Sequence, residues 1–160
     1  MRTFPFSLLL LLAVTFLSGC AQDQTSKKDS SSTSTTKAEA KKIAVISITS
    51  DPKSELQEVN MGLTFAGFCA DEGYDVNIFL NVKGVKLATN DFSNEISFKS
   101  HSPLKKQLVG LAGRGVQIHV CPVCMKDFDI PKEAIIPEAF VTDKPKLFAK
   151  LGPDTMVFTY

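Results

Sequence analysis

The sequence predicts an α/β fold in which helices cover both faces of a mostly parallel, five-stranded sheet. Short β-branched segments alternate with amphipathic segments that carry helix-start signals, and this order is typical of parallel strands joined by helical crossovers. The length of 160 residues allows one such domain, and 44% hydrophobic residues supply its core. A net charge of +1 argues against a protein that binds nucleic acid through phosphates.

The chain opens with the features of a bacterial lipoprotein signal peptide. One positive charge precedes an apolar run from Leu8 to Leu17, about the length of a signal-peptide core. The run ends in Leu-Ser-Gly-Cys, which resembles the lipobox, in which the Cys is acylated and becomes the mature N-terminus. We therefore expect residues 1–19 to be removed. Cys20 would then anchor the protein in the cell envelope, facing the periplasm, and Ala21 after it hints at the outer membrane.

Residues 20–42 are predicted to be the lipidated Cys followed by a disordered tether. Ser and Thr fill every position from Ser30 to Thr36, and Lys residues flank this run. Between Gln22 and Lys42 no large apolar residue is present whose burial could offset the entropy lost on ordering. The globular domain is therefore expected to span residues 43–160.

The first half of this domain reads as strand, helix, strand. Residues 43–48 form a continuous β-branched run, typical of a strand buried on both faces. A break at 49–52 precedes Ser54, which we expect to cap a helix over 55–71 with apolar residues at spacings of three and four. A second strand is expected over 74–80.

The second half begins with a turn at Gly84 and a polar segment, 88–100, long enough to lie near a site or an interface. Ser102-Pro103 predicts the start of a helix that reaches Ala112, followed by a third strand over 116–120. The remaining elements are short: a helix or turn at 131–135, a strand at 140–142, a helix over 144–150 and a final strand over 155–159.

The residues best suited to catalysis lie at the end of the third strand. Cys121 is expected at its carboxyl end, the edge where open α/β sheets place their sites, and Cys124 in a turn that opens a helix, where a thiolate is favoured. Alternation along the strand predicts that His119 shares a face with Cys121, so that an imidazolium would favour the Cys121 thiolate. The candidate catalytic residues are thus Cys121, Cys124 and His119. Cys69 and His101 are expected to be a structural and a solvated residue.

Four segments in this order make the domain resemble the DsrE/DsrF-like family over essentially all of residues 43–160. They are the end of the first strand (48–52), the Met-Gly-Leu-Thr-Phe-Ala segment of the first helix (61–66), the second strand with the Gly-Val pair after it (73–85), and the third strand with its two Cys (115–125). The resemblance implies a three-layer α/β/α domain that assembles into homo-oligomers. It also implies sulfur relay as a persulfide carried by Cys121, with Cys124 marking a CxxC-bearing branch.

Three classes of function remain open from the sequence. The first is thiol chemistry, with Cys121 as nucleophile and Cys124 as resolving thiol, on a sulfur- or thiol-carrying protein partner. The second is Cu(I) binding through His119, Cys121, Cys124 and Met125, since N and S ligands suit that ion. The third is a binding or assembly module without chemistry. The sequence contains no hydrolase triad and no phosphate-binding loop, and we expect no cofactor and no nucleic-acid partner.

Overall fold

The computed structural model describes residues 42–160. The signal peptide, Cys20 and the tether up to residue 41 lie outside the described residues. Five strands form one sheet in the order β4-β3-β2-β1-β5, and every neighbouring pair is parallel. The strands are β1 (Ile43–Ile48), β2 (Asp75–Leu80), β3 (Gln117–Val120), β4 (Ala139–Val141) and β5 (Thr155–Thr159). The prediction of a mostly parallel, five-stranded sheet is therefore confirmed.

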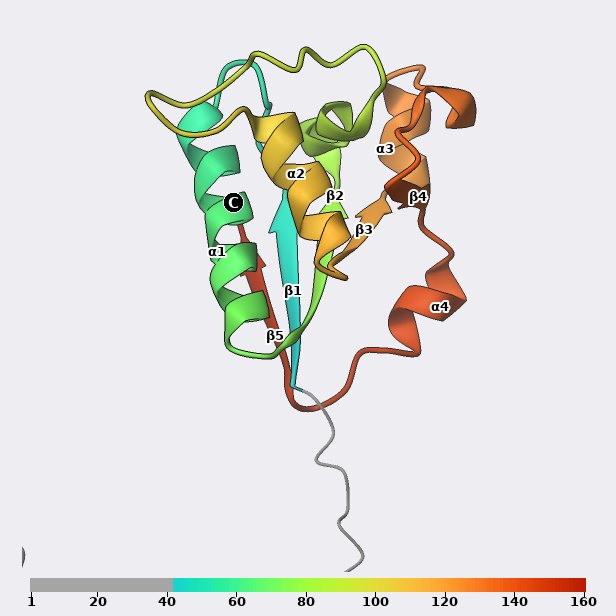
Figure 1. The fold of residues 1–160 in the computed structure, drawn as a ribbon. Helices are drawn as coiled ribbons and strands as arrows, with labels where there is room; N and C mark the ends of the chain where they lie inside the picture. The colour runs from blue at the N-terminus through green and yellow to red at the C-terminus, as the bar shows by residue number, and fades with distance from the viewer. Residues whose placement is uncertain (1–41) are drawn as a thin grey trace, which may run out of the picture. The chain divides into compact units, whose positions relative to one another are not determined.

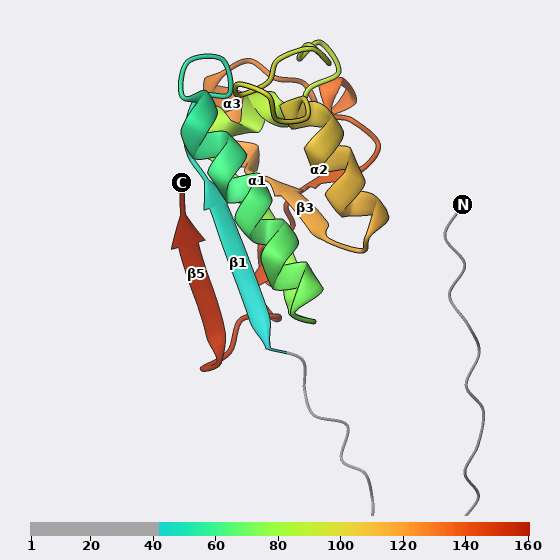
Figure 2. The ribbon, with the colours of Figure 1, turned by 60° about the vertical axis from the view of Figure 1, so that its left-hand side comes forward.

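Two long helices lie side by side on one face of the sheet (Figures 1 and 2). The helices are α1 (Leu56–Asp71), α2 (Leu104–Gly113), α3 (Pro122–Asp127) and α4 (Lys144–Phe148), with short 3-10 helices η1 (Val82–Ala88) and η2 (Lys132–Ala134). The connections through α1 and α2 step across the sheet in one direction, so right-handed crossovers place both helices on the same face. The connection from β4 to β5 returns across the sheet, which places α4 on the opposite face.

The face under α1 and α2 is apolar throughout. Side chains that point toward these helices from the three central strands are inaccessible to solvent: Ala44, Ile46, Ile48, Ile78, Leu80, Ile118 and Val120. Leu63 of α1 and Leu108 of α2 are buried against them in one hydrophobic cluster. Burial of this kind is the main stabilising contribution to a domain of this size.

The opposite face of the same strands carries polar side chains. Ser47, Asn77 and His119 are all buried there, next to the apolar Val45. β1 is therefore buried on both faces, as the sequence predicted, but one of its two faces is not purely apolar. Among residues 42–160, no helix has the length and apolar character needed to cross a membrane.

The predicted helix start at Ser54 is not the observed one. The helix begins at Leu56 after Glu55, and the Glu55 side chain makes no capping hydrogen bond to it. Instead the carbonyl oxygen of Asp51 accepts the N–H groups of both Ser54 and Glu55, and the Glu55 carboxylate accepts the Asp51 N–H at 2.5 Å. These bonds use residues 51–55 for a separate turn, which leaves Ser54 one residue outside the capping position.

Candidate functional site

Cys121 lies where β3 ends and α3 begins. Its N–H donates to the Leu80 carbonyl at 2.9 Å, which extends the pairing between β2 and β3 by one bond, and its carbonyl accepts the Met125 N–H at 3.0 Å. The backbone of Cys121 is thus fixed by the sheet on one side and by the first turn of α3 on the other. This position is the carboxyl edge of the sheet, as the sequence predicted, and Figure 1 shows α3 beyond the tip of β3.

Cys124 lies in the first turn of the same helix, and both thiols of the pair are half-buried and unoxidised. The Cys124 Sγ accepts the backbone N–H of Val82 at an N···S distance of 3.0 Å. Burial raises the pKa of the Cys124 thiol, the neighbouring Cys121 thiol raises it further, and the Val82 N–H opposes both. Cys124 is therefore held as a protonated thiol beside Cys121 in the resting state.

The loop after β2 supplies the Val82 contact, and sequence reasoning did not find it. The sequence marked Gly84 as a turn, but no signal in it identifies Val82 as a neighbour of Cys124, since 42 positions separate the two residues. Val82 is the first residue of η1, and η1 packs against α3. The sheet brings the two segments together because β2 and β3 are neighbours that end at the same edge.

His119 is not the imidazolium that the sequence suggested beside Cys121. Its side chain is only 2% exposed, its Nε2 lies 3.2 Å from Asn77 Oδ1, and its ring packs edge-on against Phe140 at 4.4 Å. Burial lowers the pKa of His119 to about 4, and the nearby Lys150 cation contributes, so the ring is neutral at physiological pH. β3 ends at Val120 and the chain turns into α3 at Cys121, so strand alternation does not extend to the Cys.

The four proposed Cu(I) ligands are not gathered into one site. Within residues 42–160, no group of three or more His, Cys, Asp or Glu side chains is placed to hold a metal ion. Met125 is buried in the hydrophobic core, and His119 contacts Asn77 and Phe140. The structure brings together only the two sulfurs of Cys121 and Cys124 from this set.

The other two residues considered from the sequence lie apart from the pair. Cys69 is part of the hydrophobic core on α1, and burial raises the pKa of its thiol. His101 is exposed in the loop before α2, with its ring stacked on Phe98. Neither residue contributes a side chain to the region around Cys121 and Cys124.

A hollow of about 200 Å³ begins one helical turn beyond Cys124. Its lining residues are Lys53, Lys86, Thr89, Asp91, Phe92, Phe128 and Ile130. The Phe128 N–H donates to the Cys124 carbonyl, and Lys86 Nζ lies 4.8 Å above the Phe128 ring and 2.9 Å from Asp51 Oδ2. The surface next to the thiols therefore combines an aromatic ring with paired charges.

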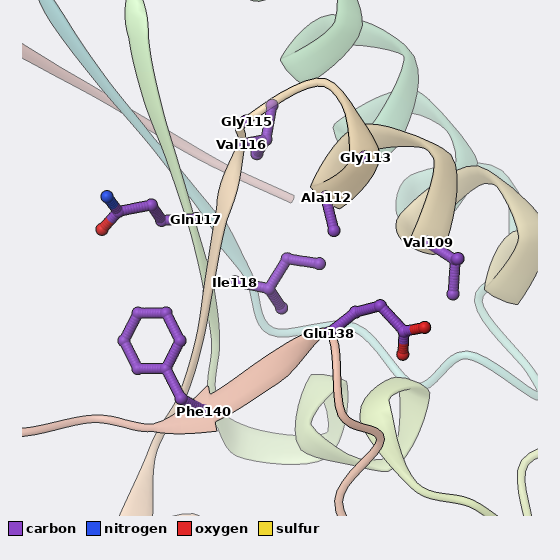
Figure 3. A pocket seen from close by; sticks show the side chains of 9 residues that line it. All are labelled: Val109, Ala112, Gly113, Gly115, Val116, Gln117, Ile118, Glu138 and Phe140. Atoms are coloured by element: carbon purple, nitrogen blue, oxygen red, sulfur yellow. The ribbon is translucent and has the colours of Figure 1, made fainter.

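A larger hollow, of about 530 Å³, lies at the edge of the sheet where β4 is short. Figure 3 shows Val109, Ala112 and Ile118 on one side of β3, and Gln117 and Phe140 on the other. Its lining contains neither Cys121 nor Cys124, so the hollow is separate from the thiol pair.

Comparisons with solved structures agree with this fold. The alignment with the ychN protein of E. coli includes 76% of this chain and 100% of that protein, with a TM-score of 0.60 and 17% sequence identity. The alignment with a protein of unknown function from Methanobacterium thermoautotrophicum includes 74% of this chain and 99% of that protein, with a TM-score of 0.55 and 12% sequence identity. The comparison with curated proteins gives no match.

The sequence also matches the profile of the DsrE/DsrF-like family, over residues 41–152. This range contains β1 to β4, all the helices and both thiols of the pair. Because this match covers most of the chain, the chain belongs to the DsrE/DsrF-like family.

Proposed function

We propose that this protein performs cysteine thiol chemistry through Cys121 and Cys124. The observation that carries the proposal is the placement of two free thiols in one helical turn at the carboxyl edge of the sheet, with the Cys124 sulfur bonded to a peptide N–H. The raised pKa of Cys124 supports the assignment of Cys121 as the attacking thiol and Cys124 as the resolving thiol. His119 takes no part in this scheme, because its ring is buried, neutral and engaged elsewhere.

Two reactions fit this pair. In thiol–disulfide exchange, the Cys121 thiolate attacks a disulfide of a partner, a mixed disulfide forms on Cys121 and the partner's thiolate leaves. Cys124 then attacks the Cys121 sulfur and releases the second partner thiolate, which leaves a Cys121–Cys124 disulfide. In sulfur transfer, Cys121 accepts a sulfane sulfur from a persulfide donor, which leaves as a thiol. An acceptor thiolate then takes the sulfur, or Cys124 displaces it as hydrosulfide.

Intact mass of the full chain, purified without oxygen and compared with and without reductant, separates these reactions. A persulfide appears as a gain of one sulfur on Cys121, and a disulfide as a loss of two hydrogens. Cys121→Ser is expected to abolish both species, Cys124→Ser to leave Cys121 able to hold an adduct, and Cys69→Ser to change neither. If no species differs between the parent chain and Cys121→Ser after exposure to a persulfide or disulfide donor, the binding or assembly module becomes the better assignment.

We also propose that the chain is exported and anchored by a lipid on Cys20. The support is the Leu-Ser-Gly-Cys segment after an apolar run and the polar stretch that follows it. Cys20→Ala is expected to block processing or to release the protein from the membrane fraction. Unchanged processing and membrane attachment in this variant would contradict the anchor.

A homo-oligomer is the third part of the proposal. Phe140, Phe148 and Val157 are exposed large apolar side chains on the elements around the face opposite α1 and α2. A second copy would cover such side chains. Sedimentation of the full chain in detergent is expected to give a mass above that of one chain, and a single chain at high concentration would contradict this.

A further inference from the structure

The Val82 peptide presents its N–H group directly to one sulfur of the thiol pair. The nitrogen lies 3.0 Å from Cys124 Sγ, and the contact joins residues of different elements. A peptide N–H aimed at a sulfur stabilises negative charge on it, since hydrogen bonds to ionised acceptors are stronger than bonds to neutral ones. The contact therefore gains in strength whenever Cys124 becomes a thiolate.

Val82 holds this position in a backbone conformation that its side chain disfavours. Its φ angle is +47°, in the left-handed region where a β-branched residue is a rare outlier. Such conformations persist only where the surrounding structure forces them, and they occur preferentially at functional sites.

The end of β1 supplies that constraint. The Asn81 N–H donates to the Ile48 carbonyl at 3.1 Å, and its side-chain amide donates to Ser47 Oγ at 3.2 Å. Gly84 packs directly against the backbone of Ile48. A Cβ added at Gly84 would lie 2.2 Å from the Ile48 carbonyl oxygen. Val82 is therefore held between two residues that are both fixed on β1.

We propose that the Val82 N–H is a positioning group that stabilises the Cys124 thiolate and so makes Cys124 the leaving sulfur when the Cys121–Cys124 disulfide is reduced. The inference deepens the proposed function and rests on it. A thiolate of the external reductant attacks Cys121 Sγ, the bond between the two protein sulfurs breaks, and its electron pair goes to Cys124 Sγ. The products are a mixed disulfide on Cys121 and a Cys124 thiolate next to the Val82 N–H.

The same group assists the reverse direction. Once Cys121 is part of a mixed disulfide, its thiol no longer opposes ionisation of Cys124, whereas the Val82 N–H remains in place. The Cys124 thiolate then attacks Cys121 Sγ and expels the partner's thiolate. The donor thus acts on whichever step requires charge on Cys124.

The test moves the donor without changing Cys124, the thiol that reports on it. Gly84→Ala displaces the loop from Ile48, whereas Gly110→Ala, on the exposed side of α2, meets nothing within 4 Å and serves as the matched control. Both are made in the full chain carrying Cys121→Ala, and the alkylation rate of Cys124 is measured against pH by peptide mass spectrometry. Gly84→Ala is expected to raise the apparent pKa of Cys124 by about one unit, which is about tenfold slower alkylation near neutral pH.

Cys69 reports in the same samples whether the variant is folded, because this thiol is buried in the core. A Cys124 profile that stays unchanged in Gly84→Ala while Cys69 remains protected overturns the inference. If Gly84→Ala exposes Cys69, the variant Asn81→Ala is used in place of Gly84→Ala. Asn81→Ala removes the side-chain hydrogen bond to Ser47, and about threefold slower alkylation of Cys124 is expected. No change in that folded variant also overturns the inference.

Failure of the proposed function gives a different result. The measurement uses chains without the Cys121 thiol and needs no exchange reaction. An unreactive Cys121 in the parent chain would remove the proposed function, yet leave the effect of the Val82 N–H on Cys124 as measured.

Discussion

The two faces of the sheet are buried by different chemistry, although the same strands form both. Toward α1 and α2, Ile46, Ile78 and Ile118 stand in neighbouring strands and are inaccessible to solvent. The residues adjacent to these in the strands point to the opposite face. They include Asn77 and His119, which are buried but polar. The first face therefore gains its stability from apolar burial, and the second depends on satisfying hydrogen bonds.

The second face is also incompletely covered and incompletely satisfied. α4 is five residues long and is the helix that the β4–β5 crossover places there. Within the described residues 42–160, His119 Nδ1 and Thr142 Oγ1 are buried without a hydrogen-bond partner, whereas His119 Nε2 is paired with Asn77. We infer that mutations on the two faces differ in how much they lower the free energy of unfolding and in how that loss depends on pH.

The largest expected difference is between Ile46→Ala and Val45→Ala, which are neighbours in β1 on opposite faces. Ile46→Ala leaves a cavity under α1 and is expected to lower the free energy of unfolding by about 2–5 kcal/mol. Val45→Ala removes two carbons from the less tightly covered face and should cost about 1–2 kcal/mol. Urea unfolding of both variants measures this. Equal losses per carbon removed, three for Ile46 and two for Val45, would show that the second face is packed as tightly as the first.

The second difference concerns pH, and His119 is its source. The unfolded chain has a His pKa near 6.5 and the folded chain about 4, so the unfolded state binds more protons between these values. Stability is therefore expected to fall as the pH drops from about 6.5 to 4, by at most about 1.4 kcal/mol per pH unit from this group. Urea midpoints at pH 7 and pH 5 should differ less in His119→Gln than in the parent chain.

His101→Gln is the matched control for this measurement. His101 is exposed before α2, and its replacement should leave the pH dependence of the parent chain unchanged. An equal slope in the parent chain and in His119→Gln would assign the pH dependence to other groups, such as the Asp51 carboxylate paired with Lys86.

The sequence predicted the apolar face well, because that face depends on patterns that are local in the chain. The run of residues 43–48 and the spacing of apolar residues in 55–71 predict β1 and α1 to within two residues. The final strand was predicted at its observed bounds. Cys121 was placed at the carboxyl edge from strand order alone, and the structure confirms that position.

The contacts at the site and on the second face could not be predicted from the sequence, because they join residues that are far apart in the chain. The Val82–Cys124 contact depends on a left-handed residue that no propensity would assign to Val. The state of His119 depends on Asn77 and Phe140, which approach it from the two neighbouring strands. Alternation predicted that His119 shares a face with Cys121, but β3 ends at Val120, and the pattern could not identify the groups from the other strands that meet the ring.

A third and smaller difference is expected at Phe140, which covers His119 while remaining 44% exposed itself. Phe140→Ala removes an aromatic contact that contributes about 0.5–1.5 kcal/mol beyond area burial. It also admits water to the ring, so the pKa of His119 should rise from about 4 toward its ordinary value. A histidine NMR titration measures this shift, and an unchanged pKa would show that other groups keep His119 desolvated.

The smallest expected effect is at Val157, which is 62% exposed on β5 at the edge of the sheet. In a single chain, Val157→Thr removes little buried apolar area and preserves the β-branched shape that suits a strand, so the free energy of unfolding should change by less than about 0.5 kcal/mol. In a homo-oligomer that covers this side chain, the hydroxyl would be buried at the interface and the loss would be larger. Urea unfolding at two protein concentrations distinguishes these cases, because the stability of an oligomer depends on concentration and that of a single chain does not. A midpoint that is independent of concentration and unaffected by Val157→Thr would contradict a second copy on this part of the face.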